Sequence, residues 1–118
     1  MAIRRIEPGA RMSQGVVYGD TVYLAGQVAD EPVGRGVTAQ TQNILEQIDR
    51  LLAAAGTDKE QLLTATIYLA DIATFAEMNA AWDAWVSKEN PPTRATVEAK
   101  LAAPEYLVEI VVVAARAA

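Results

Sequence analysis

Glu109 interrupts an apolar segment near the end of the chain. The segment Leu107–Ala115 reads LVEIVVVAA, and Glu109 is its only polar residue. An ionised carboxylate buried alone is costly, so it requires a partner, a raised pKa or a role that compensates for the burial. Alternate residues of a strand share a face, which places Glu109 with Leu107, Val111 and Val113. Glu109 is therefore a candidate catalytic residue; the alternatives are a buried ion pair or a place at a solvated rim.

Arg94 is the second candidate. It stands in the stretch NPPTRATVEA, where alternation predicts that Arg94, Thr96 and Glu98 share one face of a strand. A guanidinium suits bidentate binding of a carboxylate, either of the protein or of a ligand. Because the turn to the Glu109 strand is short, we expect the two strands to be neighbours and Arg94 to be the partner of Glu109. An arginine facing solvent at the strand entrance is the alternative.

Two further stretches carry polar groups that could form a site. Asn79 interrupts the apolar stripe of a predicted helix, four residues after Phe75 and three before Trp82. A buried amide costs free energy unless it is hydrogen-bonded, so Asn79 contacts a cap or loop, or serves a site. The sequence Gly34-Arg35-Gly36 could form an anion nest, but it lacks the GxGxxG and GK[ST] patterns and is interpreted as a flexible loop.

The side-chain inventory restricts the chemistry. The chain contains no Cys and no His, which excludes disulfides, thiolate nucleophiles, imidazole bases and the usual zinc ligands. Acid–base chemistry must use carboxylates, Lys, Tyr or a held water molecule. The net charge of −5 and the scattered basic residues disfavour a nucleic-acid partner. No metal site is expected.

Length and hydropathy indicate one globular domain, residues 1–118. Hydrophobic residues make up 52% of the 118 residues, enough for a core. No apolar run approaches the ~20 residues of a membrane span, and MAIRRIEPGA lacks the apolar region of a secretory signal. We therefore expect no membrane partner and a cytoplasmic location.

Hydrophobic periodicity predicts an alternation of strands and helices. The expected strands are Ile3–Glu7, Val16–Tyr18, Thr21–Leu24, Leu62–Ala70, Arg94–Leu101 and Leu107–Ala115, with a hairpin turn at Gly19-Asp20. The expected helices run from Thr38 or Thr41 to about Ala55, before Gly56, and from Ile72 to about Lys88, with Asp71 as N-cap. This order predicts an α/β (α+β) fold, a single mixed β-sheet with both helices packed on one face.

The other face of this sheet is left without a cover. Its strands are still apolar, and a sheet that is apolar on both sides usually has a second cover. We therefore expect a homo-oligomer.

Several segments together resemble one known family. AGQVADEP, NILEQIDRLLAAAGTD, ATIYLADIATFAEMNAAW, NPPTRATVEA and LVEIVVVAA resemble, in this order, the Rid (YjgF-type) reactive-intermediate deaminases, some of which are named L-PSP endoribonucleases. The resemblance extends from about Ser13 to Ala115. It implies a chorismate-mutase-like sheet with two helices on one face, assembled as a homotrimer around a central barrel, with ligand clefts between subunits.

The resemblance also implies roles for particular residues. Arg94, in Pro92-Thr93-Arg94, would bind the carboxylate of the substrate, and Glu109 would position or activate water. Gly26 and Gln27 would line the cleft, and Asn79 would have a functional or supporting role.

Three positions depart from the best-known branch of the family. Ala25 replaces the usual Ser, Met12 takes the place of an aromatic residue, and Thr96 replaces a Cys two residues after the motif Arg. Thr96 is therefore expected at the substrate. The changes at Ala25 and Met12 weaken the case for the same substrate and rate.

The implied reaction is hydrolysis of enamine or imine intermediates derived from amino acids to 2-keto acids and ammonia. It requires no metal and no organic cofactor, and the small-molecule partner would be an imino or keto acid. A non-catalytic module that binds small carboxylates is the alternative. An endoribonuclease is disfavoured by the acidic charge and the lack of His.

Overall fold

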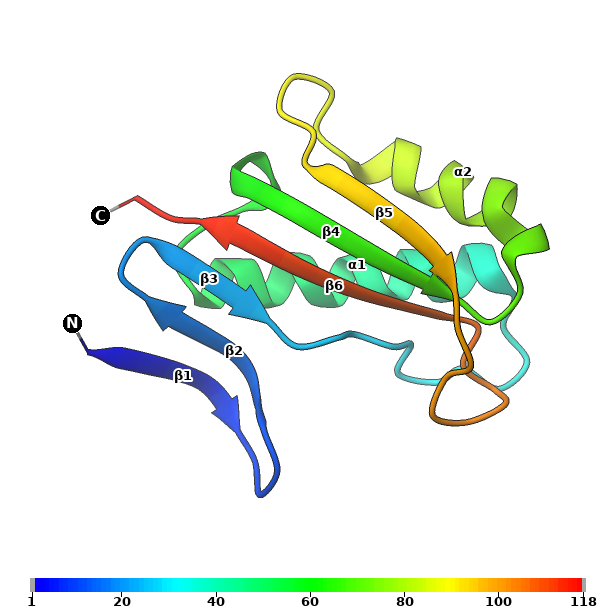
Figure 1. Cartoon of the computed structure of the whole chain (residues 1–118), viewed down its shortest axis with the longest axis horizontal. Helices are drawn as coiled ribbons and strands as arrows, with labels where there is room; N and C mark the ends of the chain where they lie inside the picture. Colours follow the sequence, from blue (N-terminus) through cyan, green and yellow to red (C-terminus); the bar gives the residue numbers. More distant parts are fainter. Residues whose placement is uncertain (1, 118) are drawn as a thin grey trace.

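The strands and helices follow the hydrophobic pattern of the sequence closely. A computed structural model describes residues 2–117. The strands are β1 (Ile3–Pro8), β2 (Ser13–Tyr18), β3 (Thr21–Leu24), β4 (Leu62–Leu69), β5 (Thr93–Glu98) and β6 (Val108–Ala115); the helices are α1 (Val37–Ala54) and α2 (Phe75–Trp85), with short 3-10 turns η1 (Lys59–Gln61) and η2 (Ile72–Thr74) (Figure 1). The expected hairpin is present, with Tyr18 paired to Thr21 and Gly19 at φ 61.

The strands form one mixed sheet in the order β1-β2-β3-β6-β4-β5. All neighbours are antiparallel except β4 and β5, which are parallel and joined through α2. The prediction that β5 and β6 are neighbours is wrong, because β4 lies between them. A helical crossover leaves β5 parallel to β4 at the sheet edge, whereas the apolar β6 takes a central place between β3 and β4.

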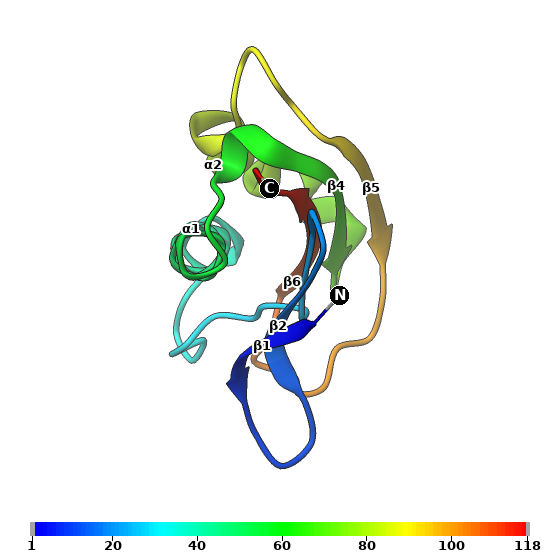
Figure 2. The same ribbon diagram turned by 90° about the vertical axis from the view of Figure 1, so that its left-hand side faces the viewer.

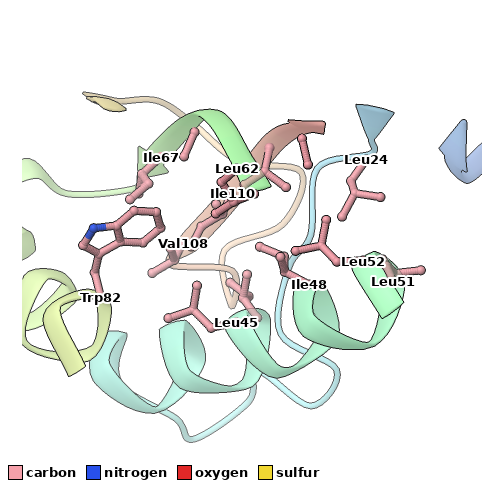
Figure 3. Packing of buried hydrophobic residues seen from close by; sticks show 14 of the residues in the cluster. Leu24, Leu45, Ile48, Leu51, Leu52, Leu62, Ile67, Trp82, Val108 and Ile110 are labelled. Carbon is pink, nitrogen blue, oxygen red and sulfur yellow. The ribbon is translucent and has the colours of Figure 1, made fainter. Parts of the chain in front are cut away.

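The core lies between the sheet and the two helices, as predicted. Both helices lie on the same side of the sheet (Figure 2). The helix-facing residues of β6 are at most 1% exposed, and the apolar stripe of α1 and its C-cap is fully buried. In the core, Val108, Ile110, Val112 and Ala114 of β6 cluster with Ile44, Ile48, Leu51, Leu52 and Ala55. Figure 3 shows this packing from close by. Within residues 2–117, neither helix is long and apolar enough to cross a membrane.

The helix boundaries differ in detail from the expectation. Gly36 is the N-cap of α1, whereas Thr41 lies inside the helix and donates from Oγ1 to the Val37 carbonyl at 2.8 Å. Gly56, at φ 82, ends the helix as expected. Asp71 caps η2 rather than α2, because its carboxylate accepts from Ala73 N at 2.9 Å.

Helix α2 is shorter at its end than predicted. Val86 is already extended, at φ −61 and ψ 143. The Trp85 carbonyl accepts a hydrogen bond from Lys59 Nζ at 2.6 Å. This side chain takes the place of the backbone N–H group that would bond to the Trp85 carbonyl if the helix continued for another turn.

The opposite face of the sheet has no cover within residues 2–117. Glu109, Val111 and Val113 of β6 are half-buried on this face, while Tyr23 of β3 is 50% exposed beside them. The predicted uncovered apolar face is therefore confirmed. The homotrimer that would cover it stays a prediction.

Candidate functional site

Glu109 projects from the uncovered face of the sheet. It lies in the middle of β6, paired in register with Tyr68 of β4. Its carboxylate lies directly against the backbone of Gly26: a Cβ atom built at Gly26 would lie 2.3 Å from Glu109 Oε2 and 3.0 Å from Cδ. Because such distances are far inside van der Waals contact, position 26 accepts only glycine while the carboxylate keeps this place.

Backbone pairing holds Gly26 against Glu109. Gln27 N donates to the Ile110 carbonyl at 2.9 Å, and Ile110 N donates to the Gln27 carbonyl at 3.1 Å. This isolated bridge brings the segment after β3 onto β6. The two predicted cleft residues, Gly26 and Gln27, are thus brought together with Glu109.

The side chain of Gln27 faces a polar pocket rather than the carboxylate. It is 5% exposed, and its Nε2 donates to Gln14 Oε1 at 3.0 Å and to the Ala25 carbonyl at 2.9 Å. The pocket has a volume of about 340 Å³ and is lined by Glu7, Gln14, Gly26, Gln27, Val28, Ala29, Asp30, Gln47, Arg50 and Tyr106. Gln27 therefore fixes the segment that carries Gly26.

Arg94 lies on the other side of the sheet. It pairs with Ala65 of β4, so its side chain projects towards the helices, and it is half-buried. Its guanidinium carbon lies 5.6 Å from the ring centre of Phe75 and 5.5 Å from that of Trp82. Among residues 2–117, the guanidinium forms no ion pair with a carboxylate.

Two oxygens near Arg94 have no hydrogen-bond partner. Asn79 Oδ1 and Thr96 Oγ1 are buried, and neither is hydrogen-bonded within the described part of the chain. Thr96 pairs with Ile67, so it shares the helix-facing side of β5 with Arg94, and Asn79 lies on α2 between Phe75 and Trp82. Buried polar atoms in proteins are normally paired with protein groups or ordered water, so these two oxygens are unusual. The expected cap or loop contact is not made by Asn79 Oδ1.

We call Phe75, Asn79, Trp82, Arg94 and Thr96 the Arg94 cluster. It combines one cation, two aromatic rings and two buried oxygens without hydrogen-bond partners, beside the edge strand β5. A small carboxylate with a neighbouring hydrogen-bond donor matches this set.

The predicted pairing of Arg94 with Glu109 is wrong. Strand β4 separates their strands, and the two side chains project from opposite faces of the sheet. Within one chain, the Arg94 cluster and the Gly26–Glu109 contact are therefore two separate half-sites.

Sequence reasoning missed Gln40, a buried residue of α1 that positions the start of β6. Gln40 is fully buried, and its Nε2 donates to the carbonyls of Pro32, Arg35 and Glu105 at 3.2, 3.1 and 3.0 Å. Its Oε1 accepts from Leu107 N at 3.0 Å, two residues before Glu109. The signal that could have revealed it is its position: Gln40 lies four residues before Ile44, on the apolar stripe of α1, where an amide side chain is unusual.

The remaining predicted positions lie outside both half-sites or beside them. Met12 is 50% exposed in the loop between β1 and β2, and Ala25 lies next to Gly26. In the Gly34-Arg35-Gly36 loop, the Arg35 carbonyl accepts a hydrogen bond from Gln40, and the Arg35 N–H donates to the Pro32 carbonyl. The backbone groups of Arg35 are therefore bonded within the protein. Residues 2–117 contain no cluster of acidic residues that could hold a metal ion.

Comparison with known proteins identifies the family. The profile of the family described as endoribonuclease L-PSP matches residues 2–116. The chain belongs to the YjgF/L-PSP family. It is 47% identical over 114 residues to a RutC family protein of Haemophilus influenzae, covering 97% of this chain and 98% of that protein.

Further relatives agree in sequence and fold. The chain is 46% identical over 115 residues to the RutC family protein YoaB of Escherichia coli, covering 98% and 99% of the two chains. A crystal structure of a YjgF family member from Neisseria meningitidis is 43% identical, with a TM-score of 0.96 over 100% of this chain and 98% of that one. The resemblance to the Rid, YjgF and L-PSP family is thereby confirmed, together with its fold.

Proposed function

We propose that this YjgF/L-PSP family member hydrolyses imines or enamines of 2-amino acids to 2-keto acids and ammonia. The observation that carries this proposal is that Arg94 contacts aromatic rings and has no carboxylate partner among residues 2–117. Its guanidinium lies half-buried over two aromatic rings and forms no ion pair with a carboxylate in residues 2–117. A cation held in this way favours a carboxylate supplied by a ligand.

We also propose that the complete site forms between subunits of a homotrimer. Arg94 and Glu109 project from opposite faces of the sheet, so one chain does not bring them to the same small molecule. The uncovered face around Glu109 is apolar enough to be an interface. The family resemblance implies ligand clefts between subunits. We propose that one subunit contributes its Arg94 cluster to such a cleft and another contributes Glu109.

The proposed mechanism uses orientation more than strong acid–base catalysis. Arg94 binds the carboxylate of the imino acid and thereby fixes the neighbouring carbon. Glu109 accepts a hydrogen bond from water and orients it towards that carbon. A new C–O bond forms while the electrons of the protonated C=N bond move to nitrogen, giving a carbinolamine. One proton then moves from the added oxygen to nitrogen, which makes the nitrogen a neutral leaving group. The hydroxyl loses its remaining proton to solvent as the C=O bond forms and the C–N bond breaks, releasing ammonia and the 2-keto acid.

The test is turnover of an imine produced in the assay. We expect the protein to accelerate ammonia and keto-acid release from enzymatically generated 2-aminoacrylate or a longer-chain imine, relative to buffer. Acceleration should be absent with Arg94→Ala. Failure to accelerate hydrolysis across several side chains would contradict the deaminase proposal.

A non-catalytic module that binds small carboxylates is the second candidate. The separation of Arg94 from Glu109 within one chain favours it, because the Arg94 cluster alone could bind an acid without hydrolysing it. Binding of 2-oxobutanoate without any imine turnover would support this candidate. Ribonuclease activity, which the family description names, is disfavoured by the net charge of −5 and the absence of His.

A further inference from the structure

Aromatic rings, rather than a carboxylate, hold the guanidinium of Arg94. Its central carbon lies 5.6 Å from the Phe75 ring centre and 5.5 Å from the Trp82 ring centre, within the range of a cation–π contact. Trp82 is 5% exposed, whereas Phe75 is 41% exposed. Arg94 therefore has one buried aromatic neighbour and one at the surface.

The geometry of α2 brings both rings to the same place. Phe75 and Trp82 are seven residues apart, which is close to two helical turns, so both face β5. Trp82 also contacts Trp85, with ring centres 5.4 Å apart. Trp85 is itself fixed, since its Nε1 donates to Asp49 Oδ2 at 3.0 Å. Figure 3 shows the Trp82 indole packed among the core residues close to Ile67 and Val108.

This mode of support has a consequence for ligand binding. A protein carboxylate would occupy the N–H groups of the guanidinium and neutralise its charge. An aromatic ring instead attracts the cation through its π face and leaves the N–H donors available. The rings restrict the side chain of Arg94 while its charge and hydrogen bonds remain for another anion.

We propose that Phe75 and Trp82 are positioning residues that hold Arg94 ready for the carboxylate of a small acid. The identity of the ligand rests on the proposed function, but the contact between the rings and the guanidinium does not. Phe75 is the more informative position, because its partial exposure allows substitution with little damage to the core.

The first experiment tests the contact without any ligand. Thermal unfolding is compared for the wild type, Phe75→Leu, Arg94→Met and the double variant. We expect Phe75→Leu to lower the melting temperature more in the wild type than in the Arg94→Met background, because the contact exists only in the former. Equal shifts in both backgrounds would overturn the proposal whether or not the protein binds acids.

The second experiment measures 2-oxobutanoate binding by calorimetry. We expect Phe75→Leu to weaken binding about three- to tenfold and Phe75→Tyr, which keeps a π face, to restore most of the affinity. At position 82, Trp82→Leu should likewise weaken 2-oxobutanoate binding more than Trp82→Phe, which keeps an aromatic ring. Equal affinities for the Leu and Tyr variants at position 75 would contradict a positioning role. Absence of binding by the wild type would instead contradict the proposed function, with the unfolding comparison still deciding the contact.

Discussion

The backbone of Gly26 and the carboxylate of Glu109 are packed so closely that no side chain fits between them. A Cβ atom at position 26 would lie 2.3 Å from Oε2, 3.0 Å from Cδ and 3.2 Å from Cγ of Glu109. The pairing of Gln27 with Ile110 prevents the glycine segment from moving away. Because the crowded atoms are the end of the flexible Glu109 side chain, a Cβ atom at position 26 should displace the carboxylate, which links Gly26 to the orientation of Glu109.

Under the proposed function, Gly26→Ala should reduce catalysis through Glu109. We expect kcat for imine hydrolysis to fall by about 10²-fold, the effect of misplacing a catalytic group by about 1 Å. Gly36→Ala is the matched control, because a Cβ atom there meets nothing within 4 Å. Steady-state kinetics should show wild-type rates for this control. Equal rates for both variants would contradict the proposed role of the contact.

Arg94→Ala should abolish imine turnover while the protein remains folded. The guanidinium has no carboxylate partner within residues 2–117, so its removal leaves no buried charge unpaired. Circular dichroism and the melting temperature check the fold, and ammonia release checks activity. Arg94→Lys should recover only part of the activity, since an ammonium cannot form the bidentate contact. Unfolding of Arg94→Ala would show that the residue has a mainly structural role.

Glu109→Gln should separate binding from chemistry. The amide keeps the size of the carboxylate but is a weaker acceptor for the hydrogen bond of an attacking water. We expect kcat to fall at least about tenfold while the Kd of 2-oxobutanoate changes little. Calorimetry and turnover assays measure the two quantities on the same preparation. An unchanged kcat would remove the role assigned to Glu109.

The alternation of residues located each half-site, but it did not show how the two are related. The period of two in Leu107–Ala115 correctly placed Glu109 on one face with Val111 and Val113. The same rule placed Arg94 and Thr96 together. It did not reveal that α2 makes β5 parallel to β4 and leaves the two half-sites on opposite faces, because strand order depends on the crossover and not on local pattern.

Gln40→Leu should destabilise the fold and loosen the start of β6. The substitution removes the bonds to the carbonyls of Pro32, Arg35 and Glu105 and to Leu107 N, leaving buried groups unpaired. We expect the free energy of unfolding to fall by about 2–4 kcal/mol, measured in urea. Gln42→Leu, at an exposed position of the same helix, is the control and should have little effect. Similar unfolding free energies for both variants would contradict the prediction.

Glu60 should make stability depend on pH in mildly acidic solution. Its Oε1 accepts hydrogen bonds from Ser87 Oγ at 2.7 Å and Asn90 Nδ2 at 3.1 Å, and these bonds lower the pKa of Glu60 below its usual value of 4.5. The contribution of these hydrogen bonds to the free energy of unfolding is therefore fully present above pH 4.5. It is lost as the pH falls through the lower pKa of the folded state, because the unfolded chain binds the proton first.

Replacing Glu60 should therefore flatten this part of the stability profile. Glu60→Gln keeps an acceptor oxygen but cannot ionise, so we expect its melting temperature to fall less than that of the wild type between about pH 5 and about pH 3. Glu46→Gln, at an exposed position of α1, is the matched control and should follow the wild type. Since Ser87 and Asn90 belong to the segment that leads into β5, losing their bonds to Glu60 should also loosen the approach to Arg94. Parallel melting profiles for the wild type and Glu60→Gln would show that these hydrogen bonds do not favour the ionised carboxylate.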